Sequence, residues 1–217
     1  MRKALGSIAA GVMLLTAFAG GSAWADTNVV TAKGQWLAAK LDQMGVETKW
    51  IAGEHVDWDT GLPDGRPELS SGRHTHCSAF VAATAKRFGV YILRPPEHEQ
   101  ALLANAQNEW LAEEGASKGW RPVAGPELAQ DLANRGMLVV ASYHNHRDDK
   151  PGHIAIVRPN ARSAGQIAAE GPEVIQAGTV NSASISIRAG FAGHAHAWND
   201  NEIDYYAHDL PNASAKR

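Results

Sequence analysis

The chain has 217 residues, of which 44% are hydrophobic, and a formal net charge of −3. This length suits a single domain with one substantial core, and the acidic balance argues against binding to nucleic acid, because phosphate backbones are bound mainly by clustered Lys and Arg. Beyond the N-terminal segment, no run of about 18 uninterrupted apolar residues occurs, so no membrane span is predicted.

The first residues predict a cleavable signal peptide. Two basic residues precede an apolar run through Phe18, and the segment AWA at 23–25 has the small-x-small pattern that a signal peptidase cuts after. We therefore expect a signal peptide at 1–25 and one domain over 26–217. The protein would then be periplasmic or secreted. We expect a monomer, although the sequence leaves the oligomeric state open.

Apolar residues at helical spacing predict four helices, at about 33–44, 77–88, 97–113 and 126–135. Residues 51–76, between the first two helices, are rich in Gly, Pro, Asp and Ser, which indicates a loop. A loop that leads directly into Cys77 is a place where binding residues tend to lie.

After the last of these helices the period of the pattern changes. Short β-branched runs bounded by Gly, Pro, Asn and Asp predict strands at 137–144, 153–159, 172–178 and 183–190. Helices followed by strands are typical of an α+β domain, so we expect N-terminal helices packed on a mostly antiparallel sheet.

Cys77 is the only cysteine of the chain, and it stands where the second predicted helix begins. A helix N-terminus stabilises a thiolate, so we expect the pKa of this thiol to be lowered. A free cysteine is more often a small buried apolar residue. In an exported protein, however, a single cysteine cannot form an internal disulfide, which leaves an intermolecular bridge or a reactive thiol. We favour the reactive thiol.

A histidine far along the chain supplies a candidate base for this thiol. His153 follows Pro151-Gly152 and opens the predicted strand at 153–159, so its side chain would lie at the rim of the sheet. An imidazole beside a cysteine activates the thiol as a nucleophile. Cys77 and His153 therefore suggest a cysteine–histidine hydrolase.

Three separated segments resemble the NlpC-type papain-like cysteine peptidases. CSAFVAATAKRFGVYILRPP, from Cys77, is similar to their nucleophile helix, and GMLVVASY followed by GHIAIVRP is similar to their paired strands, of which the second begins with the catalytic histidine. VDWDTG stands where that family has an aromatic-Gly-Gly loop. The related CHAP amidases fit almost as well. The chain departs from the family pattern at His76 and Ala79, where an aspartate and a glycine are usual.

The resemblance implies a papain-like fold and an exported hydrolase that cuts an amide bond in peptidoglycan or a peptide, as an endopeptidase or amidase, without a metal or organic cofactor. Cys77 would be the nucleophile and His153 the base. The third member would be a polar residue on the strand after the histidine strand. Gln176 is our first choice and Asn181 the second, with Asn181 otherwise supporting a loop. Trp58, His76 and Tyr143 are candidates for the substrate cleft.

A different class of function is suggested by histidines two residues apart. The pairs are His74-x-His76, His144-x-His146 and His194-x-His196. Two imidazoles at this spacing on a strand lie on one face and could share a zinc ion. The alternative is therefore a non-catalytic or zinc-binding periplasmic module, although solvated loop histidines explain the same pattern.

Overall fold

The structure is a computed structural model that describes residues 29–69 and 74–211. The signal peptide expected at 1–25 lies outside the described residues. Within them, no helix is long and apolar enough to cross a membrane.

The described residues form seven α-helices and six strands. The helices are α1 (Ala32–Asp42), α2 (Cys77–Arg87), α3 (Leu103–Glu113), α4 (Pro126–Asn134), α5 (Ala164–Glu170), α6 (Ile187–Gly190) and α7 (Ala195–Asn199). The strands are β1 (Arg121–Val123), β2 (Leu138–Tyr143), β3 (His153–Val157), β4 (Glu173–Ala177), β5 (Asn181–Ser186) and β6 (Asp204–His208).

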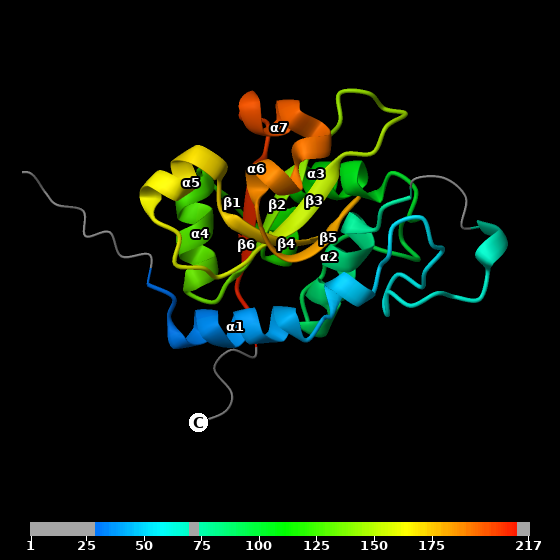
Figure 1. Cartoon of the computed structure of the whole chain (residues 1–217), viewed down its shortest axis with the longest axis horizontal. Helices are drawn as coiled ribbons and strands as arrows, with labels where there is room; N and C mark the ends of the chain where they lie inside the picture. The colour runs from blue at the N-terminus through cyan, green and yellow to red at the C-terminus, as the bar shows by residue number, and fades with distance from the viewer. Residues whose placement is uncertain (1–28, 70–73, 212–217) are drawn as a thin grey trace, which may run out of the picture.

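All six strands belong to one sheet, in the order β1-β6-β2-β3-β4-β5, and every neighbouring pair is antiparallel. The prediction of an α+β fold with a mostly antiparallel sheet is thus confirmed. Strands β2, β3 and β4 are buried along their whole length, because helices cover both faces of the sheet (Figure 1).

Side chains alternate between the two faces and divide the interior into two cores. Ile154 and Ile156 of β3 face the core that contains α2, whereas Ala155 and Val157 face the core built with α4, α6 and α7. Figure 1 shows α4 and α5 beside one another, well separated from α2. Helices α2 and α3 pack on one face of the sheet, as expected, and the second face is covered mainly by helices that follow α3.

Helix α2 is buried on all sides over its first nine residues, and only Lys86 and Arg87 at its end are exposed. Every residue from Cys77 to Ala85 is inaccessible or nearly so, and four of them are alanines, which let the backbone of α2 approach its neighbours closely. A helix that is apolar all round belongs in the interior. Phe80 packs edge-on against Trp50 of the preceding loop at 5.3 Å between ring centroids, so α2 joins the loop to the sheet.

Two predicted elements differ from the structure. The helix expected at 97–113 begins only at Leu103, because Leu102 has a φ of 54° and a helix cannot pass through this left-handed conformation. The strand expected at 183–190 is β5 followed by α6, since the Ser186 hydroxyl caps a new helix by accepting a hydrogen bond from the Ala189 N–H. Strands β1 and β6 and helices α5 and α7 were not predicted.

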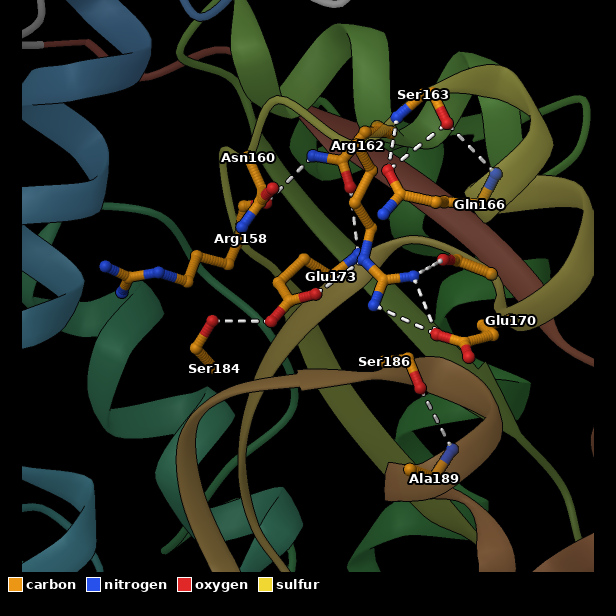
Figure 2. Close-up of polar contacts among 12 residues, drawn as sticks. Arg158, Asn160, Arg162, Ser163, Gln166, Glu170, Glu173, Ser184, Ser186 and Ala189 are labelled. Atoms are coloured by element: carbon orange, nitrogen blue, oxygen red, sulfur yellow. Dashed lines mark hydrogen bonds and ion pairs between the residues drawn. The ribbon is translucent and has the colours of Figure 1, made fainter.

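A buried ion pair fastens the start of β4 to the segment before α5. The Arg162 guanidinium donates to Glu173 at 2.6 Å and to Glu170 at 3.2 Å, and the Ser184 hydroxyl donates to the other oxygen of Glu173 (Figure 2). The Arg162 and Glu173 side chains are only 14% and 10% exposed. Loss of one partner would leave the other charge buried without full compensation.

Arg162→Met should accordingly destabilise the protein by about 3 kcal/mol. The measurement is the free energy of unfolding in urea. Arg135→Met is the matched control, because the pair that Arg135 forms with Asp131 is solvent-accessible and should cost less than about 1 kcal/mol. Equal losses of unfolding free energy in the two variants would show that the buried ion pair stabilises the fold no more than the exposed one.

Candidate active site

Cys77 is the first residue of α2 and is 4% exposed. Its thiol lies against the start of β3, close to the backbone N–H of Ile154, the residue that follows His153. The cap position of α2 is held by His76, whose side chain does not cap the helix but instead bonds the Glu54 carbonyl at 2.9 Å. The first N–H groups of α2 therefore have no side-chain cap and remain available to an acceptor beside the thiol.

The expected lowering of the Cys77 pKa is wrong for this structure. Burial raises the pKa of the thiol, and the nearby N–H groups of Ile154 and Ser78 oppose that rise only in part. The reason is that a helix N-terminus stabilises an anion most effectively where some solvation remains, whereas Cys77 is enclosed by the core on most sides. At neutral pH, Cys77 is therefore a neutral thiol.

His153 is held by Gln176. The His153 Nε2 lies 2.8 Å from Gln176 Oε1, and both side chains are buried. The Gln176 amide nitrogen donates to the Val180 carbonyl at 3.3 Å. The amide oxygen Oε1 is therefore the atom that faces His153, and it can only accept a hydrogen bond. A neutral His153 thus carries its proton on Nε2 and leaves the lone pair of Nδ1 free to accept one.

Burial also sets the charge of His153. Desolvation lowers the pKa of its imidazole, and the hydrogen bond to Gln176 opposes the change. Phe191 stands edge-on to the imidazole at 4.5 Å between ring centroids, and the His194 ring is stacked at 6.0 Å. His153 is consequently uncharged at neutral pH, as a proton acceptor must be.

The thiol and the imidazole lie on opposite faces of the sheet, and no hydrogen bond joins them in this structure. Cys77 belongs to the core beside α2, whereas His153 packs against Phe191 of the opposite core. The two residues are connected only through the backbone of β3. His153 is followed directly by Ile154, whose backbone N–H lies beside the Cys77 thiol.

The entry to β3 is shaped by two residues whose role was not predicted. The Asn105 side chain of α3 accepts hydrogen bonds from the N–H groups of Asn145 and Gly152 and donates to the Lys150 carbonyl, so it clamps both ends of the β2–β3 loop. A side chain on Gly152 would have its Cβ 2.0 Å from the Tyr143 carbonyl oxygen. The glycine before His153 was a visible signal, whereas nothing in the sequence marked Asn105.

Cys77 opens on a cavity of about 260 Å³, which is lined also by Thr75, Gln100, Leu103 and Pro151. A neighbouring hollow of about 220 Å³ shares Thr75 and Gln100 with it and reaches Glu54 and His76. The two hollows therefore lie along the N-terminal end of α2, beside the thiol.

The structure separates the remaining candidates. Asn181 does not reach His153, because its amide donates to the carbonyls of Val46, Lys49 and Trp50 and so supports that loop. Tyr143 pairs with His153 in the sheet register, and its ring lies 5.4 Å from that of His194. His76 lines the hollow beside Cys77, whereas Trp58 lies away from it under the Lys86 ammonium.

The histidine pairs do not gather into a metal site. Among the described residues, no group of three or more His, Cys, Asp or Glu side chains has the arrangement to hold a metal ion. His144, His146 and His196 each bond a carboxylate instead, those of Glu109, Glu202 and Asp200.

No protein-family model matches the chain, and no curated protein is significantly similar to it. Inference about function therefore depends on the residues themselves and on their arrangement.

The raised pKa of Cys77 predicts how the thiol responds to pH. Because only the thiolate reacts, alkylation of the native protein by iodoacetamide should be slow at pH 7 and should continue to accelerate above pH 9.0, the ordinary value for a thiol. Mass spectrometry of the labelled protein gives the rate, with the chain unfolded in urea as the control. A native rate that has already levelled off near pH 7 would show that the thiol is ionised.

Proposed function

We propose that the protein is a papain-like cysteine hydrolase that cleaves an amide bond through an acyl-enzyme. The observation that carries this proposal is the buried hydrogen bond between His153 Nε2 and Gln176 Oε1. His153 directly precedes Ile154, whose backbone N–H lies beside the Cys77 thiol. A histidine that is desolvated, neutral and oriented by an amide has the unprotonated ring nitrogen that a general base needs.

In this structure the Cys77 thiol and the His153 imidazole face opposite cores, so the proposed reaction requires the start of β3 to rearrange as the substrate enters. The thiol then transfers its proton to His153 Nδ1. The sulfur attacks the amide carbonyl carbon, and the oxyanion that forms is held by the uncapped N–H groups at the start of α2. His153 then gives the proton to the leaving amine, so that the C–N bond breaks and a thioester remains. Water, deprotonated by His153, hydrolyses the thioester and restores the thiol.

The neutral resting pair agrees with this route. A raised pKa at Cys77 and a lowered pKa at His153 place both groups in their uncharged forms at neutral pH. Proton transfer then accompanies the attack, whereas a preformed thiolate–imidazolium pair would need charge in the interior before substrate binds.

The proposed substrate is the peptide part of peptidoglycan, or the amide that joins it to the sugar. Its support is the resemblance of the Cys77 helix and the His153 strand to the NlpC-type peptidases and CHAP amidases. The predicted signal peptide at 1–25 supports the same proposal, since it would place the enzyme in the periplasm or outside the cell.

Substitution of the nucleophile tests the reaction. Cys77→Ala should abolish release of fragments from purified cell-wall sacculi, as measured by mass spectrometry, and His153→Ala should lower the rate by about 10²–10⁴-fold. Thr84→Ala, on the same helix but seven residues from Cys77, is the control and should retain activity. Unchanged digestion by Cys77→Ala would exclude a thiol nucleophile, and inactivity of the parent protein on sacculi would remove peptidoglycan as the substrate.

The role of Gln176 is tested by comparison with Asn181. Gln176→Ala should reduce kcat by about 10-fold or more while KM changes little, because the amide orients His153 and does not contact substrate. Asn181→Ala should instead lower the stability, since three carbonyl groups lose their donor. Steady-state kinetics and urea unfolding separate the two effects. A Gln176→Ala variant with normal kcat would contradict the assigned role.

A further inference from the structure

A cavity of about 570 Å³ lies on the face of the sheet opposite to Cys77. It is bounded by the turn between β1 and α4, by α5, by α7 and by the start of β6. This volume falls within the range of small-molecule sites in proteins, roughly 300–1,000 Å³. The proposed hydrolase reaction makes no use of this cavity.

Trp198 of α7 gives the cavity an aromatic wall. One edge of its indole packs on Gly171, where an added Cβ would lie 2.8 Å from Trp198 Cζ3, so the ring is fixed in place. The side chain is nevertheless only half-buried, and Val123 and Ile203 extend the apolar surface beside it. The indole is therefore a flat surface against which the apolar face of a ligand can stack.

The polar side chains that accompany this wall are unpaired. Four of the lining side chains have no hydrogen-bond or ion-pair partner among the described residues, namely those of Glu127, Trp198, Asn201 and Tyr205. Together they offer both donors and acceptors, because the indole N–H only donates, the carboxylate only accepts, and the amide and the hydroxyl do both.

The Tyr205 hydroxyl is the most enclosed of these groups. The residue is only 5% exposed, yet its oxygen is not sealed from solvent, so the hydroxyl opens on the cavity that Tyr205 lines. Burial raises the pKa of Tyr205 and the charge of Glu127 adds to the rise, which places the carboxylate near a hydroxyl that stays protonated at neutral pH. Polar groups in such a position ordinarily have a partner.

The Asn201 amide lies at the cavity beside Trp198. Its backbone has a φ of 55°, a left-handed conformation that Asn adopts more readily than most residues, and its N–H donates to the Trp198 carbonyl at 3.3 Å. The turn that ends α7 thus brings an amide and an indole together at one wall of the cavity.

Charge does not define the ligand of this cavity. None of the described residues that line it is Lys, Arg or His. Of its two acidic residues, Asp204 accepts a hydrogen bond from Asn108 of α3 on the opposite face, and Glu127 is exposed to solvent. The cavity therefore selects a ligand by hydrogen bonds in both directions and by an aromatic surface.

We propose that this cavity binds a neutral pyranose sugar with equatorial hydroxyl groups. The C–H groups of such a ring form an apolar face that stacks on Trp198. Its hydroxyls donate to Glu127 and exchange hydrogen bonds with Tyr205 and Asn201. An open-chain polyol has similar hydroxyls but no flat apolar face, and a purely apolar ligand would leave the polar side chains unpaired.

The probes for this proposal are two disaccharides, cellobiose and N,N′-diacetylchitobiose, with sorbitol as the open-chain polyol. Isothermal titration calorimetry of the purified protein should show one saturable site for a disaccharide, bound at least about 10-fold more tightly than sorbitol. The disaccharide that binds more tightly distinguishes a plain sugar from an N-acetylated one. Equal affinity for sorbitol, or no saturable binding of either disaccharide up to about 10 mM, would overturn the proposal.

Substitutions assign the binding to the cavity. Trp198→Ala should weaken it by at least about 10-fold, because the stacking surface is lost. Tyr205→Phe and Asn201→Gly should each weaken it by about 3–10-fold, since each removes hydrogen-bonding groups and keeps the backbone, and glycine tolerates the φ of Asn201. Tyr91→Phe is the matched control and should bind as the parent does, because Tyr91 packs against the other core.

The sugar site does not rest on the proposed hydrolase function, and its test is separate. Cys77→Ala should bind the disaccharide with unchanged affinity, since Cys77 belongs to the opposite core. If the double variant Tyr205→Phe/Asn201→Gly retained the affinity of the parent, the sugar would bind elsewhere and the proposal would fail, whatever the outcome of the sacculus digestion.

Discussion

The burial of α2 from Cys77 to Ala85 is the constraint on which the rest of the structure depends. A helix with alanines on several sides can be enclosed only if the sheet, α3 and the preceding loop all pack against it. This enclosure presses the start of α2 against the start of β3, and so the thiol of Cys77 meets the backbone beside His153. The same enclosure removes water from the thiol, whereas Phe191 and His194 on the opposite face shield His153. For Cys77, position and protonation state are therefore two consequences of one packing arrangement.

Desolvation determines the protonation states of Cys77 and His153. The amide of Gln176 and the N–H groups around Cys77 each favour charge, yet burial outweighs both, raising the pKa of the thiol and lowering that of the imidazole. In the proposed reaction, the proton moves only when a substrate provides the polar partner that charge requires. The uncapped first turn of α2 would offer that substrate hydrogen-bond donors.

The sheet separates two environments. On one face, a narrow hollow leads to a thiol among apolar side chains. On the other face, a wider cavity lies between β6, α4 and α7. Strand β4 links the first site to the second core, since its Gln176 orients His153 while its Glu173 is anchored by Arg162. Both faces depend on the same strands but use alternate residues of them.

The sequence by itself determined the class of fold and the principal candidates for the site. Periodicity identified helices α1, α2 and α4 and strands β2, β3 and β4. These segments are long enough or apolar enough that the residues which the pattern marks as apolar are the ones buried in the fold. It placed Gln176 on the strand after His153. It missed the short, polar-flanked β1 and β6, which become strands only by pairing with neighbours distant in the chain. The clamp by Asn105, the packing of Phe191 on His153 and the cavity around Tyr205 were decided by the tertiary structure alone. The pKa of Cys77 was likewise decided by the tertiary structure. It depends on how much solvent remains around the thiol, and residues far away in the sequence determine that solvent exposure.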